Sequence, residues 1–331
     1  MTAATFTATV LDMDYAAELE KIKLSIRQAL RDDFKRQGLI VALSGGIDSS
    51  TVAALCVAAV GKERVFGIHM PEKDSSDETI GLSTTVSDHL GIDSAKEIIT
   101  PILEAVGCYQ RRDDAIRMVI DDYDSAAGWK SKIVLPSVIN SKALRLYSII
   151  ALSPDGQEIK KRLTPKAYLG IVAATNFKQR TRKMMEYYHG DRLNYAVTGT
   201  PNRLEYDQGF FVKGGDGLAD IKPIAHLYKT QVYAMARYLG LPEEICSRPP
   251  TTDTYSMPQS QEEFYFSLPY DKMDLCLYGK INGFAPQQVA PVVNLDAEQV
   301  QRVYDDIEQK RRTTRYLKLN PVLIEKSNEI Q

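Results

Sequence analysis

The chain of 331 residues is 44% hydrophobic and 25% charged, enough for one large α/β domain or two small ones, which excludes a disulfide-stapled mini-protein. Its 41 basic and 43 acidic side chains nearly cancel, so no chain-wide field favours nucleic acid or an anionic membrane. The apolar stretches are shorter than the ~20 residues that span a bilayer, and residues 1–14 lack the basic start of a secretion signal. We therefore expect a soluble, cytoplasmic protein that binds neither nucleic acid nor membranes.

Along the first hundred residues, hydrophobic periodicity predicts an alternation of helices and strands. Helices are expected at 15–37, 49–60 and 77–91, and strands at 39–43, 65–70 and 97–100. Strands that alternate with helices indicate βαβ units, and hence an α/β fold with a doubly wound parallel sheet. Ligands in such sheets collect at the carboxyl ends of the strands.

Residues 109–164 interrupt this alternation. Two apolar runs at 144–152 and 157–163 flank Ser153-Pro154-Asp155-Gly156, which predicts an antiparallel hairpin about a tight turn. We interpret the segment as an insertion into the parallel core.

Further along, residues 194–200 repeat the pattern of an apolar strand that runs into a glycine, and a helix is expected at 229–239. Short helices and polar turns fill about 260–331, and no linker divides the chain. We expect a single domain, 1–331, with an insertion at about 109–164 and a helical C-terminal segment at about 260–331.

The four cysteines indicate a reducing environment. Cys56, Cys108, Cys246 and Cys276 lie far apart and form no C-x-x-C pair. Reduced, structural thiols are therefore favoured over disulfides, metal ligands or a catalytic thiol.

A glycine-serine loop follows the first predicted strand: Ser44-Gly45-Gly46-Ile47-Asp48-Ser49-Ser50. Backbone N–H groups and the positive end of a helix meet there, and glycines let the main chain approach phosphate oxygens closely. Phosphate would repel Asp48 unless the carboxylate binds a cation, which suggests Mg²⁺ shared with a nucleotide. The alternative is an ordinary glycine turn with a helix cap. The loop matches neither a Walker A motif nor the G-x-G-x-x-G of dinucleotide folds.

This string resembles the pyrophosphate loop of the N-type ATP pyrophosphatases, which split ATP between its α and β phosphates. Within that group, the order of motifs over most of residues 39–254 is similar to the NAD synthetase family. The matching elements are Asn176-Phe177-Lys178-Gln179-Arg180-Thr181-Arg182, Thr198-Gly199-Thr200, Glu205, Lys213-Gly214-Gly215-Asp216-Gly217, Ala219-Asp220, Pro223, Leu227-Tyr228-Lys229-Thr230 and Pro250-Thr251-Thr252-Asp253. The resemblance implies an adenine nucleotide alpha-hydrolase-like, Rossmann-like fold.

The resemblance also implies a role for individual residues. ATP is assigned to Ser44, Gly45, Gly46, Ile47, Asp48, Ser49, Ser50, Thr200, Lys229 and Thr251, and the deamido dinucleotide to Arg180, Lys213, Asp220 and Lys310. Asp48 and Glu205 would hold Mg²⁺ and, with Lys229, carry catalysis. Considered one at a time, Glu205, Lys229 and Arg180 would instead be interpreted as solvated surface side chains.

The implied reaction is acyl adenylation, with ATP as co-substrate. The carboxylate of nicotinic acid adenine dinucleotide attacks the α-phosphorus of ATP, and ammonia then displaces AMP to give NAD, with pyrophosphate as the other product. Glutamine-dependent relatives carry a fused amidase domain, for which 331 residues leave no room. We therefore expect free ammonia, or ammonia from a separate glutaminase, and the resemblance implies a homodimer.

Several departures from the family pattern lie toward the carboxylate substrate. His69-Met70-Pro71 lacks the arginine that family members often place near ATP, Pro201-Asn202-Arg203-Leu204 differs from the usual polar run before Glu205, and Gln309-Lys310 stands where the family has a His-Lys pair. Two alternatives therefore stay open. One is an ammonia-dependent amidating ligase for another carboxylate, and the other is a non-catalytic nucleotide-binding paralogue.

Overall fold

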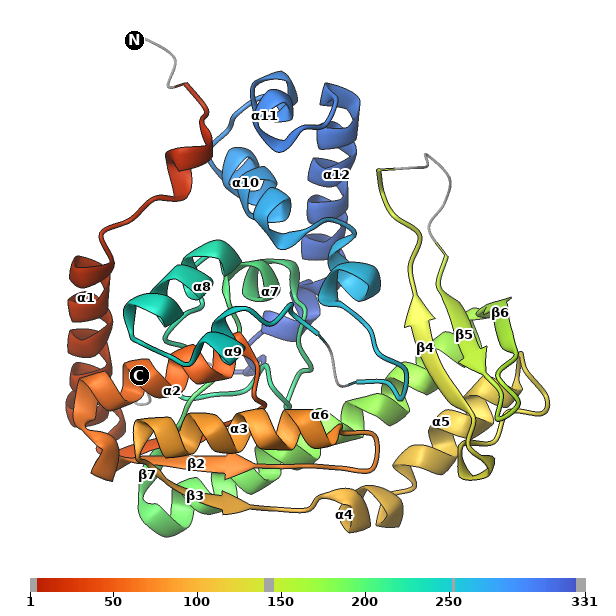
Figure 1. The fold of residues 1–331 in the computed structure, drawn as a ribbon, viewed down its shortest axis with the longest axis horizontal. Helices are drawn as coiled ribbons and strands as arrows, with labels where there is room; N and C mark the ends of the chain where they lie inside the picture. Colours follow the sequence, from red (N-terminus) through yellow and green to blue (C-terminus); the bar gives the residue numbers. More distant parts are fainter. Residues whose placement is uncertain (1–4, 140–145, 252–253, 326–331) are drawn as a thin grey trace.

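A parallel β-sheet forms the centre of the computed structural model, which describes residues 5–139, 146–251 and 254–325. Its strands are β1 (Gly38–Ala42), β2 (Val65–His69), β3 (Asp93–Lys96) and β7 (Tyr195–Val197), in the order β3-β2-β1-β7 (Figure 1). The chain winds outward from β1 through β2 to β3 and later returns to the other side of β1. This reversal leaves a crevice at the carboxyl ends of β1 and β7, where doubly wound sheets bind ligands.

Helices cover both faces of the sheet, because successive strand residues point to opposite sides. Leu39 and Val41 face a buried cluster that includes side chains of α1 (Tyr15–Gln28), α2 (Ile47–Val60), α3 (Asp77–Leu90) and α8 (Lys229–Tyr238). Ile40 faces the opposite cluster, which includes side chains of α4 (Thr100–Ala105), α5 (Cys108–Arg117) and α6 (Pro165–Leu193). The predicted α/β fold with a doubly wound parallel sheet is confirmed.

One predicted strand is misplaced, and one predicted helix has the wrong end. The third strand was expected at 97–100, but β3 is Asp93–Lys96 and Thr100 begins α4. β3 is an edge strand with mostly exposed side chains, so it has no apolar run, and the apolar Ile99 is instead buried in the cluster with α4. The first helix was expected to reach residue 37. It passes into a π-helical turn (Ala29–Phe34) and ends at Lys35, whose φ of 53° is left-handed.

The insertion carries a second, antiparallel sheet of β4 (Lys130–Val134), β5 (Ser148–Leu152) and β6 (Glu158–Arg162). The predicted hairpin is confirmed as β5–β6, with Gly156 in the turn at a φ of +86°, although residues 144–145 of its first predicted strand lie outside the described residues. β4 was not predicted. It pairs with β5 across a connection that sequence periodicity does not reveal, with Ile133 opposite Ile149.

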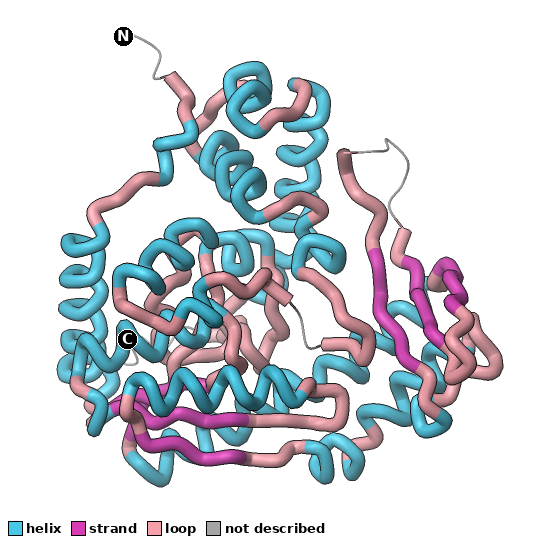
Figure 2. Tube along the Cα trace, viewed as in Figure 1, coloured by secondary structure: helices cyan, strands magenta, loops and turns pink. Residues whose placement is uncertain are grey.

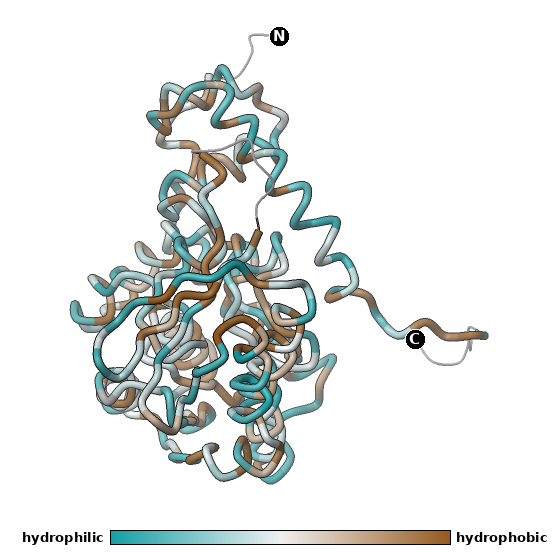
Figure 3. The backbone as a smooth tube through the Cα atoms, turned by 90° about the vertical axis from the view of Figure 1, so that its right-hand side faces the viewer, coloured by the Kyte–Doolittle hydropathy of each residue, from teal (hydrophilic) through white to brown (hydrophobic). Residues whose placement is uncertain are grey.

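The C-terminal segment is helical, as Figure 2 shows, and packs around a buried cluster that also includes Phe6, Leu11 and Val138. It comprises α10 (Tyr270–Ile281), α11 (Pro286–Val293) and α12 (Ala297–Thr314), while the short α7 (Arg203–Gln208) and α9 (Glu243–Cys246) precede it. The stretch after α12 extends away from the body of the molecule with apolar positions along it (Figure 3). The four cysteines are buried and free. Among the described residues, no helix combines the length and the apolar character needed to cross a membrane.

Candidate active site

A cavity of about 1420 Å³ lies at the carboxyl ends of β1 and β7. Ligand pockets commonly enclose ~300–1,000 Å³, so this cavity has room for more than one nucleotide-sized molecule. Its walls come from the loops after β1, β2 and β7, from α6, from the start of α8, from residues 248–251 and 254–255, and from α12. The sheet topology therefore gathers segments that are distant in sequence around one space.

The glycine-serine loop turns sharply between β1 and α2, and Gly45 makes the turn possible. Its φ is +70°, and a Cβ on Gly45 would lie 2.9 Å from the carbonyl oxygen of Thr79 and 2.9 Å from the Cβ of Leu82 on α3. Both the backbone conformation and the packing exclude a side chain at this position. The loop is thus fixed against α3 with the N-terminus of α2 directed at the cavity.

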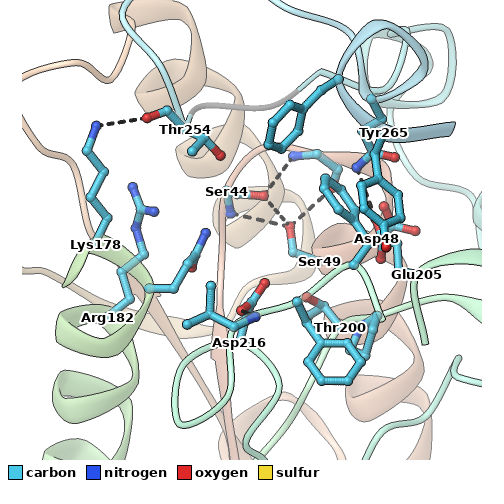
Figure 4. A pocket seen from close by; sticks show the side chains of 18 of the residues that line it. Ser44, Asp48, Ser49, Lys178, Arg182, Thr200, Glu205, Asp216, Thr254 and Tyr265 are labelled. Carbon is cyan, nitrogen blue, oxygen red and sulfur yellow. Dashed lines mark hydrogen bonds between the residues drawn. The ribbon is translucent and has the colours of Figure 1, made fainter. Parts of the chain in front are cut away.

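Hydroxyl groups line this turn. The Ser44 and Ser49 hydroxyls are hydrogen-bonded to each other at 3.1 Å, and the Ser49 oxygen also accepts from the Ser44 backbone N–H at 3.3 Å (Figure 4). Ser50 donates to the Gly46 carbonyl at 2.8 Å, back into its own helix. Of the seven loop residues, Ser44, Gly46, Ile47, Asp48 and Ser49 line the cavity, whereas Gly45 and Ser50 are not among its described lining residues.

Asp48, Lys229 and Glu205 meet at one end of the cavity. The Lys229 ammonium, on a side chain that is 2% exposed, donates a hydrogen bond to the Asp48 carboxylate. Burial alone would lower the pKa of Lys229, but Asp48 and Glu205 raise it to about 12, so the ammonium stays charged. Burial, reinforced by repulsion from Asp48, raises the pKa of Glu205 to about 8. A cation between the two carboxylates would relieve this cost.

Asn202 joins the two acids. It caps α7: its side-chain oxygen accepts from the Glu205 backbone N–H at 3.2 Å, and Glu205 accepts in return from the Asn202 backbone N–H at 3.2 Å. Its amide also donates to Asp48 at 3.0 Å, while Gln261 donates to the other Glu205 oxygen at 3.0 Å. In the sequence, Asn202 stood out only as part of a departure from the family pattern, although the spacing Asn-x-x-Glu is a capping-box signal.

Asp274 of α10 fixes the backbone of Lys229 at the start of α8. Its buried carboxylate accepts from the backbone N–H groups of Lys229, at 3.1 Å, and Thr230, at 2.7 Å, at the start of α8. Burial raises the pKa of Asp274 to about 7, although these N–H groups oppose the shift. Asp274 lies 45 residues from Lys229, so no local pattern could have indicated it.

Two further residues to which the resemblance assigns ATP, Thr200 and Thr251, lie in the cavity wall. Thr200 follows β7. Thr251 is exposed and forms an isolated antiparallel β-bridge with Ser260. Residues 252–253 of the same motif lie outside the described residues.

Of the four residues assigned to the dinucleotide, Arg180, Lys213 and Lys310 line the cavity. Lys213 donates to the carbonyls of Tyr316, at 3.1 Å, and Leu319, at 3.2 Å. Asp220 is not among the described lining residues. It is exposed and accepts hydrogen bonds from the Val197 backbone N–H at 2.7 Å and the Tyr187 hydroxyl at 3.1 Å.

The cavity is also lined by charged residues to which the sequence assigned no role. Some of them lie within the quoted motifs and others lie outside them. Lys178 and Arg182 lie on α6, as do Lys183 and Glu186, which form a buried ion pair at 2.6 Å. Asp216 accepts from the Val212 backbone N–H at 2.7 Å, and burial raises its pKa. The helical spacing of the α6 residues was visible in the sequence, but their approach to Asp216 depends on tertiary structure.

Comparison with known proteins identifies the family of the chain. The family model described as NAD synthase matches residues 18–124 and 137–316, most of the chain. The chain belongs to the NAD synthase family. Members of this family are ligases that form a C–N bond with the use of ATP, and the resemblance inferred from the motifs is confirmed.

The similarity to individual NAD synthase family members extends over nearly the whole chain. An NH(3)-dependent NAD(+) synthetase of Rhizobium meliloti is 55% identical over 98% of this chain and 97% of its own, and one of Thermotoga maritima is 33% identical over 74% and 81%. Among solved structures, the NH3-dependent NAD synthetase of Campylobacter jejuni has a TM-score of 0.60 at 22% identity, covering 95% of this chain and all of that one. The NMN synthetase of Francisella tularensis has a TM-score of 0.64 at 19% identity, with the same coverage. At these identities the two structures compare the fold only.

Proposed function

We propose that this protein amidates nicotinic acid adenine dinucleotide with ammonia at the expense of ATP, through an acyl-adenylate, to give NAD, AMP and pyrophosphate. The observation that carries the proposal is the meeting of Asp48, Glu205 and Lys229 beside the glycine-serine loop, in a chain 55% identical to an ammonia-dependent NAD(+) synthetase. This site suits pyrophosphate departure, because it combines backbone donors, a helix N-terminus and a buried cation.

ATP would lie with its phosphates against the N-terminus of α2. The Ser44 and Ser49 hydroxyls and the Lys229 ammonium would face the β and γ phosphates, with Thr200 and Thr251 contributing hydroxyl contacts. The Lys229 backbone is already held by Asp274 and its ammonium by Asp48, so little ordering cost remains when the nucleotide binds.

We propose that Asp48 and Glu205 hold Mg²⁺. The described residues contain no cluster of three or more His, Cys, Asp and Glu side chains suited to a metal. Two carboxylates completed by phosphate oxygens and water are, however, a common way to bind Mg²⁺ with a nucleotide. When bound, the ion would neutralise charge on the pyrophosphate. Asn202 donates a hydrogen bond to each of the two carboxylates and Gln261 donates to Glu205, which supports a shared role for the two acids.

The dinucleotide would occupy the basic part of the cavity formed by Arg180, Lys213 and Lys310. Its carboxylate oxygen attacks the α-phosphorus and pyrophosphate leaves. Ammonia then attacks the acyl carbon, AMP leaves with the carboxylate oxygen, and the amide nitrogen loses a proton. Positioning and charge supply the catalysis, and no covalent nucleophile from the chain is required. A contact with Asp220 stays a prediction.

We also propose that the protein works as a cytoplasmic homodimer that takes free ammonia or ammonia from a separate glutaminase. The exposed apolar side chains after α12, including Val322 and Ile324 at 84% and 96% exposure, support contact with a second copy. A solution mass near twice the chain mass of 37.0 kDa would agree with this.

The experiment that tests the proposed substrate is an amidation assay with ATP, ammonium and Mg²⁺ and a panel of carboxylates. We expect NAD to form from nicotinic acid adenine dinucleotide at the highest kcat/KM of the panel. Amidation of another carboxylate alone would overturn the substrate assignment, and ATP binding without turnover on any carboxylate would indicate a non-catalytic paralogue.

A further inference from the structure

Lys178 lies at a junction of three walls of the cavity. It projects from α6, its side chain is 2% exposed, and its ammonium donates to Glu72 at 2.8 Å, Asp74 at 2.7 Å and the Thr254 carbonyl at 3.1 Å. Glu72 and Asp74 belong to the loop after β2, and Thr254 follows the segment that carries Thr251. Figure 4 shows the side chain directed at Thr254.

These contacts decide what Lys178 can do. An ammonium has three N–H donors, and the two carboxylates and the carbonyl use all three. The group is therefore committed to the protein and has no donor left for a phosphate or carboxylate of a ligand, even though the side chain lines the cavity.

The two carboxylates that accept hydrogen bonds from Lys178 also accept hydrogen bonds from side chains of α5, at the start of the insertion. Arg112 donates to Asp74 at 2.8 Å and to Asp113 at 3.0 Å, and the Tyr109 hydroxyl donates to Glu72 at 2.7 Å. All of these side chains are buried or nearly so. A buried network with paired charges holds one geometry, because any displacement leaves a charge without a partner.

We propose that Lys178 is a positioning residue that anchors Thr254 to α6 and thereby sets the distance from Thr251, three residues earlier in the chain, to bound ATP. The proposal rests on the proposed function, in which Thr251 contacts the nucleotide. On the other side, two hydrogen bonds hold the stretch before Thr251. The Tyr233 hydroxyl donates to the Arg248 carbonyl at 2.7 Å, and the Gln261 backbone N–H donates to the Pro250 carbonyl at 3.2 Å. Lys178 supplies the attachment to the α6 wall.

The test is Lys178→Met, which keeps the apolar stem and removes the three donors. We expect the Kd for ATP, measured by calorimetry, to rise about tenfold, with kcat at saturating ATP nearly unchanged. Backbone hydrogen exchange over residues 254–260 should accelerate. The matched control is Lys73→Met, which removes an exposed ammonium 5.4 Å from the centre of the same Tyr109 ring and should leave all three readouts unchanged.

If Lys178→Met fails to fold because Glu72 is left without its cation, the double variant Lys178→Met with Glu72→Gln removes that charge and decides the matter in the same assays. A folded variant that binds ATP as tightly as the wild type would overturn the proposal. Equal losses of affinity for ATP, dinucleotide and ammonia, together with lower thermal stability, would also overturn it, because a general structural role predicts that pattern. Wild-type protein that binds ATP but makes no NAD would count against the proposed function alone.

Discussion

Among single residues, Asp48 accepts hydrogen bonds from both the Lys229 ammonium and the Asn202 amide. Asp48→Asn keeps the shape of the side chain and removes its charge. We expect kcat to fall at least about 100-fold, since charge stabilisation of the departing pyrophosphate is lost. Steady-state NAD formation measures this.

The control for Asp48 separates chemistry from folding. Asp48→Asn leaves the buried Lys229 ammonium without its partner, which costs about 3 kcal/mol of unfolding free energy. Adding Lys229→Met should restore stability in urea denaturation and leave the protein inactive. Near-normal turnover in either variant would contradict the assigned roles.

Asp274 predicts a pH dependence of stability. Burial raises its pKa to about 7, and the unfolded carboxyl has an ordinary pKa of about 3.9. Between these values the native state binds the extra proton, so the stabilisation is present below about pH 4 and is lost as pH rises toward 7, by up to ~1.4 kcal/mol per pH unit. Urea denaturation of the wild type and Asp274→Asn between pH 4 and 8 should show the difference between them changing over this range. Parallel curves would exclude the shifted carboxyl.

At the scale of elements, the turn between β1 and α2 depends on Gly45. Gly45→Ala places a Cβ 2.9 Å from the Thr79 carbonyl oxygen at a φ of +70°, so we expect a loss of about 1–3 kcal/mol in unfolding free energy and weaker ATP binding. Gly81→Ala is the matched control in α3, because a Cβ there meets nothing within 4 Å. It should raise stability by about 0.5–1 kcal/mol and leave ATP affinity unchanged. Equal behaviour of the two variants would show that the turn is not constrained.

The sequence was sufficient for elements whose signals are local. The buried strand before Ser44, the glycine turn and the hairpin about Pro154 all carry their own patterns, and the structure has them. β3 was misplaced because an edge strand needs no apolar run. β4 was missed because a strand that pairs with a distant strand needs no nearby turn.

The same distinction applies to the site. The loop residues were indicated by their order in the chain, whereas Asn202, Asp274 and the partners of Lys178 act through contacts 45 to 154 residues apart. Resemblance to a family supplies ligand-contacting positions. The side chains that hold those positions in place are visible only in three dimensions.

At the scale of the whole molecule, the net charge of −2 averages over unlike regions. Arg180, Lys213, Lys229 and Lys310 line the cavity, and two carboxylates stand beside Lys229. This asymmetry suits a reaction between two polyanionic substrates. That residues 1–331 form one domain, with an insertion at about 109–164 and a helical C-terminal segment at about 260–331, stays a prediction.

If a carboxylate is adenylated before ammonia attacks, one carboxylate oxygen must pass to AMP, and isotope transfer measures this step. Nicotinic acid adenine dinucleotide labelled with ¹⁸O in its carboxylate should be incubated with the protein, ATP, ammonium and Mg²⁺, and the products analysed by mass spectrometry. We expect NAD, AMP and pyrophosphate in equal amounts, with one ¹⁸O in the AMP phosphate. Label in inorganic phosphate together with ADP, or AMP without label, would contradict it.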